Sequence, residues 1–238
     1  MAKNLKKDRR PLSLSTRGDF YRIRAGKHAD DPTLQAAIRT HESFVKTYDS
    51  VVKMKENPDP LLPEAANRLK VSKAAKDAAA RLSKNSDAVL NDIENRKAVI
   101  ALEIHERIGI KETPHGQEIR SILRGLSAVE RGKRISQAIE NGDSELLSAV
   151  VLGHPMTLGM TQNDVEKYHE RAERAFASDL VKLRETLDEI SGLLVDSLVE
   201  TVDVAEKLEG TPQERKELRQ KREAADLAEK SLNDAFSV

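Results

Sequence analysis

The residue pair best suited to chemistry is Glu166 and His169, which stand at the ExxH spacing of di-iron helical bundles. Residues three apart share a helix face, so this carboxylate and imidazole could bind one metal ion together. A di-iron site also needs a second ExxH element and two more glutamates on facing helices. The sequence has no second ExxH copy. We interpret the pair as a surface Glu–His contact. An enzyme with a helical bundle and a metal at this pair is an alternative that ranks below the two functions considered later.

A second candidate is phosphate binding by the glycines and lysine at Gly125, Gly132 and Lys133. The two glycines are too far apart for a phosphate-binding loop, and Arg134 replaces the Ser or Thr that would hold magnesium. These residues fit a basic patch on a helix surface better. The chain contains no cysteine, which excludes disulfides, thiolate zinc sites and a cysteine nucleophile. We therefore expect a protein that is not an enzyme, with no catalytic residue, no metal and no cofactor.

The first 28 residues are strongly basic, although the formal net charge of the whole chain is zero. They carry nine Lys and Arg against two Asp, a net charge of +7 that the rest of the chain must balance. A basic arm on an acidic body can bind nucleic acid or the acidic face of a neighbouring subunit. We predict an extended arm over residues 1–28 that docks to neighbouring subunits. The predicted contact residues are Lys3, Lys6, Lys7, Arg9, Arg10, Arg17, Phe20, Tyr21, Arg22 and Arg24.

The aromatic residues of this arm are Phe20 and Tyr21, and Arg17, Arg22 and Arg24 lie close to them in the sequence. That spacing suits base stacking combined with phosphate neutralisation. It suits equally a hydrophobic hook that enters a neighbouring subunit while the arginines meet carboxylates. Protein docking is favoured because the arm has a single aromatic pair and no nucleic-acid-binding fold is indicated.

Apolar residues recur at spacings of three and four along most of the chain, which predicts helices and almost no strand. Capping residues, prolines and glycines mark the helix ends. The pattern predicts four longer helices, over residues 32–56, about 64–108, about 162–209 and 212–236. Between residues 113 and 160 it predicts three short helices, and the segment HPMTLGM (154–160) is expected to be a loop.

The three-four alternation of the apolar residues indicates coiled-coil seams. The second long helix includes Arg96 and Glu103 at seam positions, and the third includes Asp179. We predict an all-α protein with an elongated antiparallel coiled-coil stalk of two long helices, a four-helix base and a small three-helix module at one end. The predicted divisions are an arm (1–28), a helical hairpin (29–112), a small helical module (113–160) and the long and C-terminal helices (161–238).

Residues 119–162, from IRSILRGLSAVERGKRISQAIE to the loop before the third long helix, contain a recognisable pattern. The stretch resembles a segment of helical proteins encoded by tailed bacteriophages. In those proteins an R-x-L-x-x-L-like helix, a helix ending in AIE-x-GD and an AVLG-x-P-x-x-x-G-(L/M)-T loop precede a long charged helix, whereas here an additional Val151 interrupts AVLG. The matching positions are Ala138, Ile139, Glu140, Gly142, Asp143, Ala149, Val150, Gly153, Pro155, Gly159 and Thr161.

The resemblance implies a phage-encoded accessory protein of the virion, and the matched segment contains no catalytic motif. We therefore expect a structural component of the particle, such as a connector, an internal or ejection protein or a minor capsid protein. Its expected partners are other virion proteins and copies of itself in a homo-oligomer, with no small-molecule substrate. The alternative is a packaging or scaffolding factor that uses the arm on DNA.

The sequence also indicates where the protein is made. It contains no apolar run of the roughly 18 residues that a membrane helix needs, and its basic N-terminus lacks the apolar region of a signal peptide. We therefore expect no membrane-spanning segment, no secretion by a signal peptide, synthesis in the host cytoplasm and incorporation into the virion.

Overall fold

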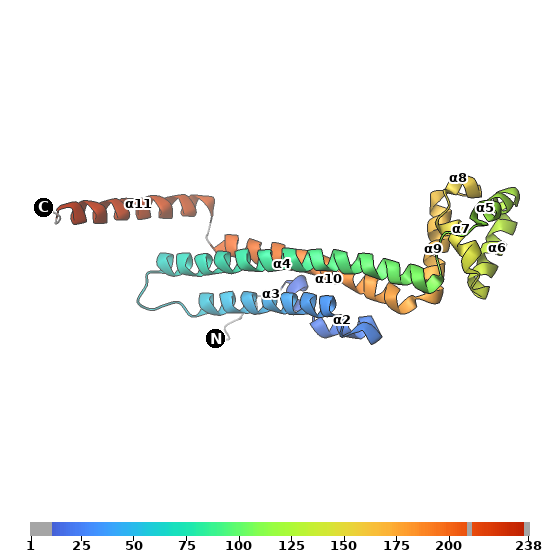
Figure 1. The fold of residues 1–238 in the computed structure, drawn as a ribbon. Coiled ribbons are helices and arrows are strands. Elements are labelled where there is room, and N and C mark those ends of the chain that lie inside the picture. The colour runs from blue at the N-terminus through green and yellow to red at the C-terminus, as the bar shows by residue number, and fades with distance from the viewer. Residues whose placement is uncertain (1–10, 209–210, 236–238) are drawn as a thin grey trace, which may run out of the picture. The chain divides into compact units, whose positions relative to one another are not determined.

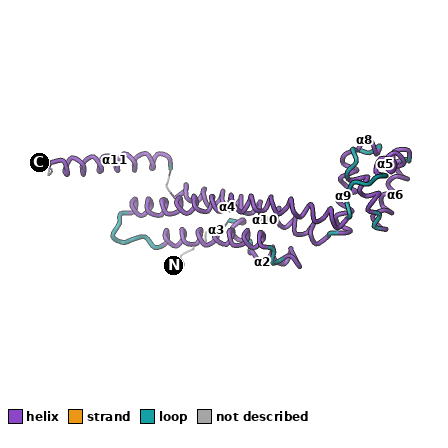
Figure 2. Tube along the Cα trace, in the orientation of Figure 1, coloured by secondary structure: helices purple, strands orange, loops and turns teal. Residues whose placement is uncertain are grey.

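The computed structural model describes residues 11–208 and 211–235, and helices make up nearly all of that part of the chain (Figure 1, Figure 2). No strand occurs among these residues, so the predicted all-α class is confirmed. The elements in chain order are α1 (Leu12–Ser15), α2 (Gly18–Ala25), a 3₁₀ turn (Gly26–His28), α3 (Pro32–Glu56), α4 (Glu64–Ile108), α5 (Gly116–Gly125), α6 (Ala128–Asn141), α7 (Ser144–Val151), α8 (Pro155–Leu158), α9 (Gln162–Phe176), α10 (Ser178–Leu208) and α11 (Pro212–Ala235).

Several helix starts follow from side-chain caps that the sequence predicts. Asp31 accepts hydrogen bonds from two backbone N–H groups in the first turn of α3, at 3.0 and 3.2 Å. Ser127 and Glu130 form a reciprocal capping box at the start of α6, and Thr161 and Asp164 form another at α9. Because each cap satisfies backbone groups that the first helical turn leaves unpaired, these boundaries can be read from local sequence.

The predicted single helix over residues 162–209 was wrong at Ala177, where α9 ends and α10 begins. Ala177 is fully buried, and its backbone N–H still bonds the carbonyl oxygen of Glu173 at 2.8 Å. The sequence does not mark this break, since alanine has the highest helix propensity. The prediction for residues 154–160 also missed a short element, because Pro155 starts the single turn of α8.

The described part of the basic segment, residues 11–28, is helical where we expected an extended arm. Leu14 and Tyr21 are buried, so this segment has apolar residues that pack against the folded chain. The Nε2 atom of the buried His41 on α3 lies 2.8 Å from the carbonyl oxygen of Ser13. Contacts within the same chain therefore order residues 11–28. The number of charged residues in the segment does not predict this.

Residue contacts divide the chain into two compact units. Unit 1 comprises residues 1–18, 36–90 and 191–238, and unit 2 comprises residues 19–35 and 91–190. This division runs through α3, α4 and α10, whereas our predicted four-part division follows the helix ends and remains a prediction.

Unit 1 contains parts of α3, α4 and α10 around a small aliphatic cluster. The cluster consists of Val51, Val71, Ala75 and Ala205, and the partly buried Val204 and Leu208 pack against it. Because residues near the start of α4 meet residues near the end of α10, the two helices run antiparallel here. The coiled-coil stalk and its four-helix base remain a prediction.

Unit 2 contains a larger core between the other parts of α4 and α10, and a compact group of shorter helices. Lys97 on α4 contacts Asp188 on α10 at 2.5 Å, and Arg107 contacts Asp179 at 2.6 Å, so the helices are antiparallel here too. Among the shorter helices, α5 contacts α7 and α8, and α6 and α7 each contact α9. The buried core includes Ile93, Ile100, Ile104, Leu180, Leu183, Leu187 and Ile190.

Two glycines within residues 119–162 have structural roles in this group of helices. Gly142 ends α6 with a φ of 69°, a backbone conformation that residues with a side chain rarely adopt. At Gly153, an added Cβ would lie 2.5 Å from the carbonyl oxygen of Ala149 and 2.7 Å from Cδ of Arg120. These two glycines therefore serve a helix end and a close approach in this fold.

Substitution Gly153→Ala is expected to lower the free energy of unfolding by about 2 kcal/mol, because the new methyl group overlaps the backbone of α7. Urea unfolding followed by circular dichroism at 222 nm measures this change. The control is Gly192→Ala inside α10, where the added Cβ meets no atom within 4 Å. The control should gain about 0.5–1 kcal/mol from higher helix propensity. Equal stabilities of the two variants would contradict the assigned close approach.

Candidate functional site

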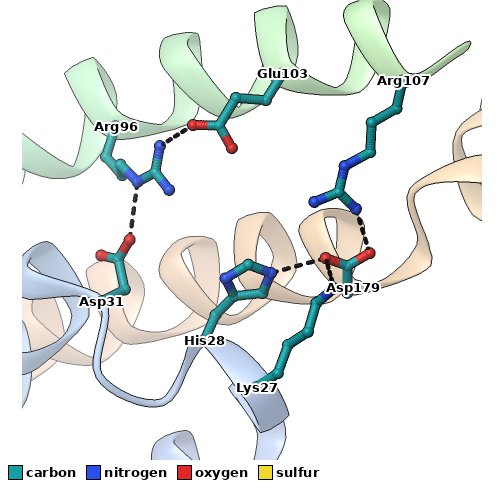
Figure 3. Close-up of polar contacts among 7 residues, drawn as sticks. All are labelled: Lys27, His28, Asp31, Arg96, Glu103, Arg107 and Asp179. Atoms are coloured by element: carbon teal, nitrogen blue, oxygen red, sulfur yellow. Dashed lines mark hydrogen bonds and ion pairs between the residues drawn. The ribbon is translucent and has the colours of Figure 1, made fainter.

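The most connected polar site of unit 2 centres on Asp179 in the first turn of α10 (Figure 3). Its Oδ2 atom lies 2.8 Å from Nε2 of His28 and 2.9 Å from Nζ of Lys27. Its Oδ1 atom accepts a hydrogen bond from Nη1 of Arg107 at 2.6 Å. Burial alone would raise the pKa of Asp179, but the hydrogen bonds from these three side chains hold that pKa far below its usual range. The carboxylate is thus held ionised by cationic partners from α4 and the 3₁₀ turn.

A second polar group lies beside it, around Arg96 on α4 (Figure 3). The Nε atom of Arg96 donates to Oδ2 of Asp31 at 2.8 Å, and Nη1 donates to Oε1 of Glu103 at 2.7 Å. Burial works to lower the pKa of Arg96, yet the bonds to Glu103 and Asp31 outweigh it and raise the pKa. Because Asp31 also caps α3, this group joins the start of α3 to α4.

The remaining arm cations of unit 2 also contact carboxylates of that unit. Arg22 bonds Asp19 at 2.7 Å, and Arg24 contacts Glu189 at 2.6 Å. Tyr21 is buried, and its burial followed by the charge of Glu189 raises its pKa. Arg22 also donates to Oε1 of Gln35 on α3 at 3.3 Å, so both arginines and the tyrosine help to attach this segment to its own unit.

Two further predicted contact residues, Phe20 and Arg17, lie at the surface. Phe20 is half exposed and makes an edge-to-face contact with Tyr21, with ring centroids 5.2 Å apart. Arg17 is exposed. Lys3, Lys6, Lys7, Arg9 and Arg10 lie outside the described residues.

Our sequence prediction missed four residues that make the Asp179 site: Lys27, His28, Arg107 and Asp179 itself. A signal for Asp179 was present, because an aspartate at a seam position of a helix must find cationic or hydrogen-bonding partners when it is buried. Arg96 at a seam position gave the same signal. The identity of the partners could not be read from spacing, since they come from distant segments.

The Glu166–His169 pair does not form a shared site. Glu166 is exposed and accepts a hydrogen bond from Gln162 at 2.9 Å. His169 instead faces His105, with ring centroids 5.3 Å apart, and its Nε2 atom lies 3.7 Å from Oε1 of Glu173. Burial lowers the pKa of His169, which favours the neutral imidazole. Over residues 11–208 and 211–235, no group of three His, Asp or Glu side chains is arranged to hold a metal ion.

Two ion pairs span the break between α9 and α10. Glu173 on α9 accepts bonds from both terminal nitrogens of Arg184 on α10, at 3.1 and 2.5 Å. Arg174 donates to Glu185 at 3.0 Å, with the same sequence spacing and opposite polarity. The first pair is the more buried, since 6% of the Glu173 side chain is exposed against 64% for Arg174. These contacts across the break stabilise the angle between α9 and α10.

The basic patch predicted around Gly132 lies on α6. Lys133 and Arg134 are exposed there. A Cβ added at Gly132 would lie 2.8 Å from the hydroxyl of Tyr168, so this glycine permits the close approach of that side chain. Gly132 therefore has a packing role at this position.

The polar sites described here neutralise charge and join helices. In the Asp179 site each oxygen of the carboxylate is occupied by a cationic or imidazole partner, an arrangement that suits attachment of segments. No helix among the described residues combines the length and apolar composition needed to cross a membrane. Comparison with protein-family models, curated proteins and solved structures finds no significant match to the chain.

Proposed function

We propose that the chain is a non-enzymatic structural component of a tailed bacteriophage particle: a connector, an internal or ejection protein, or a minor capsid protein. It binds other virion proteins and copies of itself, and it takes no small-molecule substrate. The phage assignment is supported by the resemblance of residues 119–162 to helical phage proteins.

The observation that carries the docking role is a set of exposed apolar side chains on α2 and α10. On α2, Phe20 and Ile23 are exposed. On α10, the exposed apolar residues are Val195, Val199 and Val202, which lie along one side of the helix. Such patches beside charged residues are typical of protein interfaces.

We propose further that α4 and α10 form an antiparallel coiled-coil stalk, and that α11 supplies the fourth helix of the base. The antiparallel contacts of α4 with α10 within each unit support the stalk. On the predicted apolar face of α11, Ala225 and Glu229 are exposed. The proposed four-helix base therefore requires this face of α11 to pack against another surface.

The role of the arm is narrower than its total charge suggests. Arg24, Lys27 and His28 already contact carboxylates of their own unit. We assign docking to neighbouring subunits to residues 1–10 together with the exposed side chains Phe20 and Ile23 of α2.

The proposed function is tested by a mass-spectrometric peptide map of purified particles of the phage that encodes the chain. Peptides of this chain should be present at a fixed stoichiometry to the major capsid protein after removal of free protein by density-gradient centrifugation. Their absence from intact particles would overturn the proposal.

The second candidate is a DNA packaging or scaffolding factor, favoured by the five Lys and Arg within residues 1–10. Five phosphate contacts predict that the logarithm of the binding constant falls with log salt at a slope of about −4.5. Deletion of residues 1–10 should abolish that slope and leave Leu14 and Tyr21 in place. DNA binding that is undetectable or insensitive to salt rejects this candidate.

A further inference from the structure

An open groove lies between α4 and α10 within unit 1. Each wall carries one charged residue, and the two have opposite sign: Lys76 on the α4 wall and Glu206 on the α10 wall. The other lining residues are Ala79, Ala80 and Ser83 from α4, and Leu198, Val202 and Ala205 from α10. The groove thus combines a mainly apolar lining with opposite charges on its two walls.

The α10 wall continues as an exposed row along the helix. Val195, Val199 and Val202 are 46%, 62% and 40% exposed, and Glu206 continues the row. Their spacings of four, three and four residues place all four on one side of α10, with the alternation of a coiled-coil seam. Since Val202 and Glu206 line the groove, this row borders it.

A matching row follows α4. Its members are Leu69, Lys73, Lys76, Ala80, Ser83 and Asp87, at alternating spacings of four and three residues. Three of them, Lys76, Ala80 and Ser83, line the groove, and Leu69 is 39% exposed. The row is positive at the end of Lys73 and Lys76, and Asp87 is its single carboxylate, at the opposite end.

The two helices also differ in charge over their whole lengths in this unit. Over residues 64–90, α4 carries six Lys and Arg against three Asp and Glu, a net charge of +3. Over residues 191–208, α10 carries four Asp and Glu against one Lys, a net charge of −3. A surface that is basic on one helix and acidic on the next is complementary to a second copy of itself.

The antiparallel course of the two helices in unit 1 determines how two copies can pair. A two-fold axis parallel to the helices places α4 of each copy over α10 of the other. A two-fold axis across the helices instead places α4 over α4, so that like charges meet. The first arrangement keeps each residue at its level along the pair, so Lys76 of one copy faces Glu206 of the other.

We propose that two copies associate face to face through this groove, with α4 of each copy packed on α10 of the other. This inference rests on the assembly role proposed above and names the surface by which copies associate. The valines and Leu69 are exposed in the single chain, and their burial supplies the attraction. The opposite charges of the two walls select the orientation.

The test reverses charge on each wall. One variant carries Lys73→Glu and Lys76→Glu in α4, and the other carries Glu206→Lys in α10. Sedimentation equilibrium should give the wild type twice the chain mass of 26.5 kDa. Each variant alone should dimerise at least about tenfold more weakly, since like charges then face each other in both contacts. Circular dichroism at 222 nm verifies that both variants keep their helices.

An equimolar mixture of the two variants should recover the dimer. In the mixed dimer the reversed α4 of one chain faces the reversed α10 of the other, and the two unchanged helices face each other. An ion pair between the walls of a single chain gives no such recovery. The charge control is Lys133→Glu with Arg134→Glu, two exposed residues on α6 in unit 2, which should leave the dimer unchanged.

Substitution Val199→Asp tests the apolar part of the contact. Val199 is 62% exposed in the single chain, so the change leaves the core intact but places a carboxylate in the dimer contact. The dimer should weaken at least about tenfold, because that charge loses water without gaining a partner. The matched control is Val129→Asp on α6, where the valine is 68% exposed, and it should leave the dimer unchanged.

Three results would overturn the proposal: a wild-type mass of one chain at every protein concentration measured, a dimer that ignores the charge reversals or Val199→Asp, or a mixture that stays monomeric. None of them would remove the chain from the particle, so failure of this inference is separate from failure of the virion assignment.

Discussion

Substitution Glu173→Ala is expected to lower the free energy of unfolding by about 3 kcal/mol. The side chain of Glu173 is nearly buried, and both of its oxygens bond Arg184 across the break between α9 and α10. Removing the carboxylate leaves a partly buried guanidinium without its counter-charge, which is among the most costly single changes in a protein interior. Urea unfolding monitored by circular dichroism measures the loss.

The chain provides a matched control in Arg174, which pairs with Glu185 across the same break. Because Arg174 is exposed, Arg174→Ala should cost less than about 1 kcal/mol. Replacing both Glu173 and Arg184 with leucine should be less harmful than Glu173→Ala, since no unpaired charge remains. If Glu173→Ala and Arg174→Ala lower the free energy of unfolding equally, the buried Glu173–Arg184 pair contributes no more than the exposed pair. It would then not be the contact that fixes the angle between α9 and α10.

The sequence predicted the helices of this fold well because their ends depend on local chemistry. The cap residue Asp31, the capping box of Ser127 with Glu130, and the glycine at position 109 lie next to the helix ends that they determine. The length of α4 was also predictable, since no proline or glycine interrupts its 45 residues.

Other features depend on partners that are far away in the sequence. The break at Ala177 is spanned by ion pairs eleven residues apart. In one straight helix residues at that spacing lie about 16 Å apart along the axis, so a continuous helix could not form these pairs. We expected residues 11–28 to form part of an extended arm because we judged the segment by its high positive charge. Their few apolar side chains, Leu14 and Tyr21 among them, decide the outcome once a surface is present to bury them.

The candidate site illustrates the same limit. Arg96, Glu103 and Asp179 stood at seam positions of predicted helices, so burial of charge could be anticipated. Their partners Asp31, Lys27 and His28 could not be predicted, because they come from a segment whose path depends on tertiary packing.

Substitution Asp179→Asn is expected to lower the free energy of unfolding at pH 7 by about 2 kcal/mol. The amide keeps the shape of the side chain, but it removes the charge that holds Lys27, His28 and Arg107 together. Hydrogen bonds to a charged group contribute more than neutral ones, and three partners lose that advantage at once. The control is Asp188→Asn, whose exposed carboxylate contacts Lys97 alone among the described ion pairs and should cost less than about 1 kcal/mol.

The pH dependence identifies the electrostatic origin of this loss. The pKa of Asp179 is lowered in the folded protein, so its stabilisation is fully present above the unfolded value of about 3.9. As pH falls through that value toward the folded pKa, the wild type loses this stabilisation and Asp179→Asn has none to lose. The stability gap between them should therefore narrow from about pH 5 downward, measured by urea unfolding at a series of pH values. A gap that stays constant over this range would contradict an electrostatic origin of the loss, and the charged attachment of the arm segment to α10 would have to be abandoned.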